Sequence, residues 1–472
     1  MMTTAQELAR FSSQASYDAL SAAARRALKI HILDALGCGI GALGNDLLRR
    51  IRAQVERFSG APLCTLIGGG KTAPDRAAFY NGALVRYLDF NDSYLAPGET
   101  CHPSDSLAPV LAAAEYADAS GPDLLAALAV AYQIQCRLSE VSPVRAKGFD
   151  HTTQAAFAMA AGVARALGID ADRTANAIAI SGTVGPALRV TRTGALSHWK
   201  GLAAPHAAFA STHAAFLAAH GITGPAEVFE GNKGFMDAIA GRFRVDWAHE
   251  DLERVTRTVV KKYNAEIHAQ SAIEGLLELQ YEAGFRASDV HLIGCDIFRV
   301  AYHIIGGDEE GRKTQVRTKE EADHSLPYLL AVGLLDGTVM PEQFAPARIA
   351  RADVQELLRR VRIRPVVAQG PRFPAAMPCR LGVRLRDGRL LLKIKRDYEG
   401  FVTRPIGWDA AVQKFERLAA PHVETALRRA LVTAVETLED RRARELTHLL
   451  GRVKTPQRMR TATGEQHGRA VA

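Results

Sequence analysis

Cysteine is scarce in this sequence and long apolar runs are missing, and each shortage excludes a class of protein. Only six cysteines are spread over 472 residues, and no two stand close enough for a Cys-x-x-Cys pair. We therefore expect reduced thiols rather than a disulfide framework. No uninterrupted apolar run reaches the ~18 residues that a membrane-spanning helix needs. The first residues lack the apolar segment of a secretory signal, so we expect a cytoplasmic protein without a membrane span.

The composition that is present is that of an ordinary globular protein. Apolar residues make up 47% and charged residues 23%, which excludes a largely disordered chain. The length predicts about two or three domains. Lys and Arg total 59 against 51 acidic residues, and residues 441–460 are especially basic. A basic balance favours anionic partners, either nucleic acid or small acids. Because no basic motif interleaved with aromatics and no recognition helix is present, we expect no nucleic-acid partner.

The pattern along the chain predicts a mainly α fold, with a large all-α helical domain and a smaller inserted α/β domain. Apolar residues recur at helical spacing from about residue 17 to 260, with helices at 106–118, 123–140, 152–167, 171–181 and 203–219. One stripe, Leu28, Ile32 and Leu36, ends in a Gly-rich stretch. We place the domains at 1–265 (all-α, first part), 266–402 (α/β), 403–450 (all-α, second part) and 451–472 (a basic, disordered tail).

The α/β domain is recognised by its strands. Val290–Val300 and 361–367 have strand-like patterns, and 381–395 is a hairpin, because Asp387-Gly388 separates two alternating apolar runs. Helices are expected at 326–336 and 353–360 inside this domain. After Pro405 the pattern predicts helices at 409–418 and 421–449, which return the chain to the first domain.

Two motifs imitate known sites without completing them. Gly70-Lys71-Thr72 resembles the end of a phosphate-binding loop, but Thr65 stands where that loop requires glycine. Asp323-His324-Ser325 has the residue types of a catalytic triad, but adjacent residues on one strand or helix cannot all converge. We therefore predict neither nucleotide binding nor a hydrolytic triad.

Two polar stretches in the first half of the chain are harder to dismiss. Residues 89–94 (DFNDSY) and 102–105 (HPSD) gather carboxylates, hydroxyls and an imidazole around Pro and Gly, and such a loop cannot easily be buried without partners. The plain alternative is a surface loop in which Asp105 caps a helix. Residues 148–153 (GFDHTT) contain His151, and the alternative there is that Thr152 or Thr153 caps the next helix.

Two further stretches lie nearer the predicted domain border. Residues 189–201 (RVTRTGALSHWKG) offer three fixed cations near a Trp, and the alternative is a solvated loop. Residues 261–270 (KKYNAEIHAQ) lie at the border, where clefts are common. The alternative there is that the lysines are simply solvated.

Taken in order, these stretches resemble the MmgE/PrpD family. The segment from Asn81-Gly82 through Asp89 to His102-Pro103-Ser104-Asp105 is the family's most recognisable one, and three others also match: Arg192-Thr193-Gly194 with Trp199-Lys200, Ala265–Gln270, and Ala322–Tyr328. The resemblance covers about residues 15–440. It is stronger to the branch of 2-methylcitrate dehydratases than to that of cis-aconitate decarboxylases.

The resemblance implies an all-α body, an inserted α/β lid, a homodimer and a cleft between body and lid. It implies no iron–sulfur cluster, in agreement with the scattered cysteines, and we expect no cofactor and no metal. By motif, the expected catalytic residues are Asp89, His102, His151 and His268, and the expected substrate-binding residues are Ser93, Arg192, Lys200 and Tyr263. Ser93 stands where relatives often carry Thr. Arg86 stands where many relatives have a small residue or His, which leaves the exact substrate open.

Dehydration of a tricarboxylate such as 2-methylcitrate suits these residue types. Removing a proton beside a carboxylate creates a carbanion that fixed cations must stabilise, and Lys200 and Arg192 are the candidates. One of His102 and His151 would take the proton and the other would protonate the leaving hydroxyl. Asp89 would orient an imidazole. The alternatives are cis-aconitate decarboxylation, epimerisation of an amino-dicarboxylate, or a nucleic-acid-binding or scaffold protein that uses the basic tail.

Overall fold

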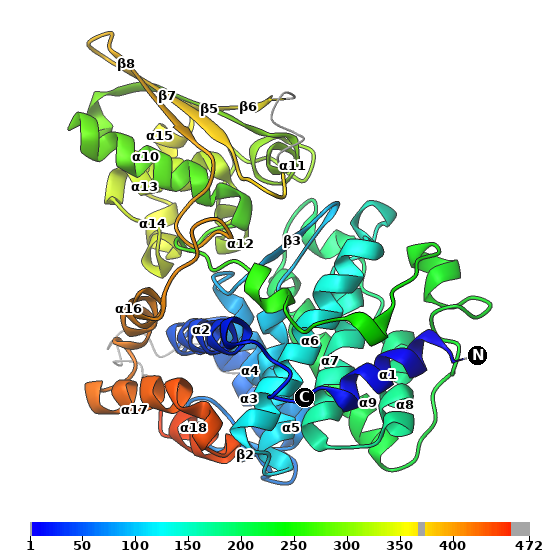
Figure 1. Ribbon diagram of the computed structural model, residues 1–472. Helices are drawn as coiled ribbons and strands as arrows, with labels where there is room; N and C mark the ends of the chain where they lie inside the picture. The colour runs from blue at the N-terminus through cyan, green and yellow to red at the C-terminus, as the bar shows by residue number, and fades with distance from the viewer. Residues whose placement is uncertain (1, 367–372, 455–472) are drawn as a thin grey trace, which may run out of the picture.

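Helices dominate the computed structural model of the chain, which describes residues 2–366 and 373–454 (Figure 1). The prediction of a mainly α fold is confirmed. Most of the predicted basic tail, from residue 455 on, and the last residue of the predicted strand 361–367 lie outside the described residues. Within them, no single helix is long and apolar enough to cross a membrane. Only α2 and α3 taken together pass that test, and they meet at a bend of 93°.

The helical body contains one of the two large hydrophobic cores. Helix α7 packs against α6, α8 and α9 in its centre, and α4 packs against α5 and α9. The bounds of its helices are α1 Thr4–Gln14, α2 Ala22–Gly41, α3 Asp46–Phe58, α4 Pro74–Tyr87, α5 Leu107–Tyr116, α6 Gly121–Val141, α7 Thr152–Leu167, α8 Ala171–Val184, α9 Ala203–Ala219, α16 Trp408–Ala419, α17 Thr425–Glu436 and α18 Ala443–Gly451. The chain after residue 405 therefore packs back on the first body, with α16 against α2.

Helix α2 ends at Gly41, inside the predicted Gly-rich stretch. Gly37 and Gly41 let α16 approach closely, because an added Cβ would lie 3.3 and 3.2 Å from atoms of α16. Two local predictions about the body were wrong. Residues 220–260 contain only short 3₁₀ and π turns, in a segment punctuated by glycines. The predicted helix 421–449 is broken into α17 and α18, because the carbonyls of 438–441 contact the first residue of α6.

The α/β module, defined as residues 266–402, contains most of the second core (Figure 1, upper left). Its sheet has the order β6-β5-β7-β8, with β5 parallel to β6 and antiparallel to β7. The strands are β5 Val290–Phe298, β6 Val361–Val366, β7 Cys379–Leu385 and β8 Leu390–Lys395, and the hairpin predicted around Asp387-Gly388 is confirmed. Helices α10 (Gln270–Ala283) and α13 (Leu326–Asp336) pack on the sheet, and α11 (Arg299–Ala301), α12 (Lys319–Ala322), α14 (Pro346–Ile349) and α15 (Ala352–Leu358) complete the module.

The chain enters and leaves the module at one place. The Val260 N–H donates to the carbonyl of Gly400 (3.1 Å), and Val259 forms an isolated β-bridge with Ser93 of the body. Gly400 has a φ of +119°, and a Cβ there would lie 2.2 Å from the Val260 oxygen, so glycine is required at this crossing. Two short hairpins flank the body's polar loops, β1 Cys64–Thr65 with β2 Lys71–Thr72 and β3 Tyr94–Ala96 with β4 Glu99–Cys101.

Candidate active site

A small polar cavity lies where the helical body meets the α/β module. Its free volume is about 40 Å³, room for about three water molecules. The lining combines five fixed cations, four imidazoles and three carboxylates with three other residues: Arg86, Arg145, Arg189, Arg192, Lys261; His102, His151, His268, His324; Asp89, Glu99, Glu266; Thr100, Ile267 and Ile304. Cations outnumber carboxylates, so the cavity suits an anionic ligand.

Asp89 follows α4 in a strained backbone conformation. Its φ is +55°, which a non-glycine residue adopts at a cost of about 1–3 kcal/mol and mostly at functional sites. Arg86 Nη1 and Lys261 Nζ donate to Asp89 Oδ1 at 2.6 and 2.9 Å. Burial raises the pKa of Asp89, but Arg86, Lys261 and Lys200 outweigh burial and hold the pKa well below its usual value. Asp89 is therefore an anion that gathers cations from three separate segments of the body.

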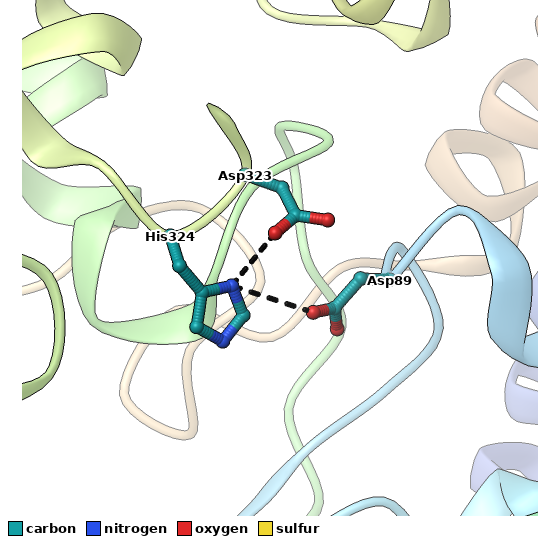
Figure 2. A group of neighbouring side chains, drawn as sticks. All are labelled: Asp89, Asp323 and His324. Carbon is teal, nitrogen blue, oxygen red and sulfur yellow. Dashed lines mark hydrogen bonds and ion pairs between the residues drawn. The ribbon is translucent and has the colours of Figure 1, made fainter. Parts of the chain in front are cut away.

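Lys200 lies inside a group of three potential ligand residues, Asp89, Asp323 and His324. Figure 2 shows the Nδ1 of His324 facing both carboxylates, and ligand atoms of all three lie within 4.8 Å of one another. The Lys200 Nζ is 2.5 Å from Asp323 Oδ1, 3.0 Å from His324 Nδ1 and 3.5 Å from Asp89 Oδ2. The ammonium thus takes the position that a metal ion would need.

His102 and His151 lie edge to face in the lining of the cavity. Their ring centroids are 5.2 Å apart and the rings are nearly perpendicular. His102 Nδ1 lies 2.7 Å from the carbonyl oxygen of Asp92 and 3.2 Å from Ser93 Oγ. Because a carbonyl only accepts, Nδ1 carries the proton in the neutral ring and Nε2 is left as the basic nitrogen.

His151 is held in the same way by a carboxylate. Its Nδ1 lies 3.3 Å from Asp150 Oδ1, and its buried Nε2 has no hydrogen-bond partner among the described residues. Burial, together with Arg192 and against the opposing effect of Asp150, lowers the pKa of His151 to about 3. Burial and the charge of Arg86 also lower the pKa of His102 well below its usual value. Both rings are therefore neutral near pH 7.

Arg192 is engaged with Asp150 and does not project freely into the cavity. Its Nε and Nη2 bind the two carboxylate oxygens at 2.5 and 3.2 Å, and Nη1 donates to the carbonyl of Lys200 (3.3 Å). The Asp150 carboxylate also accepts from the backbone N–H of Thr152 (3.2 Å). Asp150, rather than the Thr152 or Thr153 side chain considered from the sequence, binds the start of α7.

The module contributes His268 through a rigid pair with Glu266. Glu266 Oε1 is 2.7 Å from His268 Nδ1, and Oε2 accepts from the His268 backbone N–H (2.8 Å). The buried Nε2 of His268 has no partner within the described chain, and Phe298 packs against the ring. Burial opposes the effect, but His268 lowers the pKa of Glu266 to about 2. Tyr263 is buried with its ring near Lys262 (5.8 Å from Nζ to the ring centroid) and does not line the cavity.

Two buried side chains outside the cavity fix the loops that form it. Asp92 accepts from Ser104 Oγ (2.6 Å) and Tyr132 Oη (2.8 Å), which binds the loop of residues 89–94 to the segment of 102–105. Lys414 of α16 donates to the carbonyls of Phe90 and Lys261, each at 2.9 Å. The segments that carry Asp89 and Lys261 are thus held by one ammonium.

The four polar stretches singled out in the sequence all reach this region, but several members were missed. Lys261 and Glu266 lie in the border stretch, where the lysines were weighed as solvated, yet Lys261 is 0% exposed. Asp323 and His324 do converge, at 2.7 Å, because they lie in the bend after α12. Ser325 is separate from them and caps α13. The three residues therefore do not converge as a triad, as the sequence predicted, but the Asp323–His324 pair was not anticipated.

Comparison with known proteins identifies a family and several relatives. The family models described as MmgE/PrpD N-terminal domain and MmgE/PrpD C-terminal domain match residues 6–248 and 263–440. A 2-methylcitrate dehydratase of Salmonella typhimurium is 29% identical over 330 residues, 65% of this chain and 66%, just under two thirds, of its own length. One of Cupriavidus necator is 28% identical over 78% of this chain and 79% of its own length. A cis-aconitate decarboxylase of Mus musculus is 26% identical over 88% of this chain and 86% of its own length.

Proposed function

The chain belongs to the MmgE/PrpD family, and on that premise we propose that it is a hydro-lyase that dehydrates 2-methylcitrate to 2-methyl-cis-aconitate by acid–base catalysis. The observation that carries the proposal is the pair of buried, neutral imidazoles of His102 and His151, which lie edge to face in the lining of a cavity rich in fixed cations. The names of the Salmonella and Cupriavidus relatives support this substrate.

The reaction needs one base and one acid. One imidazole Nε2 takes the proton from the carbon beside a carboxylate and leaves a carbanion. The electron pair of the carbanion forms the C=C bond as the C–O bond breaks, and the departing hydroxide takes a proton from the second, protonated imidazole and leaves as water. Lys261, which lines the cavity, stabilises the negative charge that develops on the carboxylate oxygens of the substrate, and Lys200 holds Asp89 from the far side of the lining (3.5 Å). The Glu266–His268 pair bounds the site from the module.

A bound trianion favours the imidazolium that the acid step requires, and the proton is taken up from solvent. In the unliganded cavity both rings are neutral, because burial and the nearby cations lower their pKa values. Three carboxylates beside the rings favour the imidazolium form and raise those pKa values. Substrate binding therefore protonates one imidazole, which becomes the acid, and the other remains the base.

The α/β module acts as a lid in this proposal. Because the cavity holds about three waters, a tricarboxylate enters only when module and body separate. The contacts that must open include the pair of Lys200 with Asp323 (2.5 Å). When module and body close again over the bound substrate, they exclude water from the reacting carbon.

The test is turnover by the purified chain with 2-methylcitrate, citrate and cis-aconitate in parallel. Absorbance of the unsaturated acid reports dehydration, and released carbon dioxide reports decarboxylation. We expect dehydration of 2-methylcitrate. Decarboxylation of cis-aconitate alone would replace the proposal by the activity in the name of the mouse relative. The homodimer that the resemblance implies is tested by light scattering on the same sample.

A further inference from the structure

One carboxylate of the module reaches into the body and binds two arginines of the cavity. Glu310 Oε1 accepts from Arg145 Nη2 (2.7 Å) and from Arg189 Nη2 (3.0 Å). The side chains of Glu310, Arg145 and Arg189 are 12%, 19% and 15% exposed, so these ion pairs are largely shielded from water. Among the described residues, Glu310 is the carboxylate that pairs with Arg145.

The two arginines belong to the cavity, whereas Glu310 lies at its edge. Arg145 and Arg189 line the same space as His102 and His151. Glu310 lines a second, outer cleft of about 310 Å³, together with three further cations, Arg312, Lys313 and Arg317. His324 lines both spaces. A basic outer cleft beside the inner cavity concentrates polyanions near the site, and Glu310 stands between the two spaces.

Glu310 is carried by a loop with few helical or strand hydrogen bonds. The loop spans residues 307–318, between the π turn Tyr302–Gly306 and α12. Gly311 has a φ of +105° and packs against the carbonyl of Gly194, where a Cβ would lie 3.0 Å from the oxygen. Loops of this kind open at low cost compared with the core.

The Arg189 side chain is incompletely satisfied. Its Nη1 is 3.9 Å from Asp150, beyond hydrogen-bond distance, and its buried Nε has no partner in the described structure. Two planar guanidinium groups with a free N–H are suited to bind a carboxylate through several hydrogen bonds. Glu310 supplies such a carboxylate from the protein itself.

We propose that Arg145 and Arg189 form the carboxylate subsite nearest the entrance, and that Glu310 fills this subsite until a carboxylate of the substrate displaces it. The inference rests on the proposed function for the class of ligand, a polycarboxylate. It assigns Glu310 the role of an internal competitor: displacement frees the 307–318 loop and opens the inner cavity to the outer cleft.

The experiment measures binding, so it does not depend on turnover. The probe is tricarballylate, a tricarboxylate without the hydroxyl group that dehydration requires, and calorimetry gives its Kd. Glu310→Gln keeps the shape of the side chain and removes its charge. Losing two partly shielded ion pairs to the competitor should tighten Kd about fivefold. The matched control is Glu309→Gln, because Glu309 is 65% exposed and pairs with His303 outside the cavity.

A variant without the two arginines distinguishes competition by Glu310 from a general loosening of the module. When Arg145 and Arg189 are both changed to Gln, Glu310→Gln should no longer improve binding. Three results would overturn the subsite. They are weaker or unchanged binding of tricarballylate by Glu310→Gln, a gain in affinity from Glu310→Gln that persists without the two arginines, and no binding by any folded variant. If Glu310→Gln tightens binding but the protein dehydrates no substrate, only the proposed reaction is overturned. If the protein is a dehydratase but Glu310→Gln does not affect binding, only the subsite is overturned.

Discussion

Replacing Lys200 by Met tests whether its ammonium is the cation that holds the buried cluster together. The side chain is 4% exposed and contacts Asp323 at 2.5 Å, His324 at 3.0 Å and Asp89 at 3.5 Å. Met has a similar length without the charge. The change leaves two carboxylates facing an imidazole, and breaking a buried pair by removing one partner costs about 3–5 kcal/mol.

The remaining contacts set where in that range the loss should fall. Asp323 keeps Lys319 (2.9 Å), and Asp89 keeps Arg86 and Lys261. We therefore expect Lys200→Met to lower the free energy of unfolding by about 3 kcal/mol, the lower end of the range. Urea denaturation at pH 7 measures this value, and catalytic turnover should be lost in the same variant.

A divalent metal should replace the missing ammonium. Two carboxylates and an imidazole, with ligand atoms within 4.8 Å of one another, are ligand types that zinc accepts. At a Zn²⁺ concentration of about 100 times Kd, the variant should regain about 2.7 kcal/mol. Lys319→Met is the control, because it removes a cation from Asp323 but leaves Lys200 in place. The reasoning is refuted if Lys200→Met is as stable as the wild type, or if Zn²⁺ stabilises the wild type and the Lys319→Met control equally.

Three further predictions concern the imidazoles. His102→Gln should lower kcat by about 10²–10⁴-fold. The control is His249→Gln, whose side chain is 83% exposed and whose loss should leave kcat unchanged. Equal kcat in both variants would remove His102 from the mechanism. Tricarballylate binding should take up protons, because a trianion raises the pKa of His102 or His151, and calorimetry in buffers of different ionisation enthalpy detects this uptake; proton release would contradict it. Because His151 has a folded pKa of about 3 against ~6.5 when unfolded, the unfolded chain binds the proton first and stability falls as pH drops below about 6.5. Between pH 6.5 and 5, His151→Gln should lose about 2 kcal/mol less than the wild type in urea titrations, and parallel curves would show that His151 does not contribute.

Much of the fold could be predicted because its determinants are local. The predicted ranges for α7, α9 and α13 agree with the structure to within a residue or two, since helical periodicity and caps lie within one segment. The hairpin of β7 and β8 follows from one Asp-Gly pair. The break between α17 and α18 could not be predicted, because its cause is the packing of residues 438–441 against α6, more than 300 residues away.

In the candidate site, too, the features encoded within one segment could be predicted and those that depend on distant segments could not. Stretches rich in polar residues pointed to His102, His151 and His268, and all three line the cavity. Lys261 could not be distinguished from an exposed lysine, because burial depends on the body and the module together. Arg145 and Glu310 lie in no conspicuous stretch, and the pair joins residues 165 positions apart. An ion pair of that kind exists only once the fold has brought its members together.

The crossing at Val260 and Gly400 has a consequence for how this architecture can change. The two residues are hydrogen-bonded neighbours, so the outgoing and incoming ends of the insertion are already adjacent in the body. A different insert with equally close ends could occupy this position without displacing any helix of the body. Exchange of the whole insert, rather than gradual substitution, would then alter one wall of the cavity at once while Asp89, His102 and His151 stay in place.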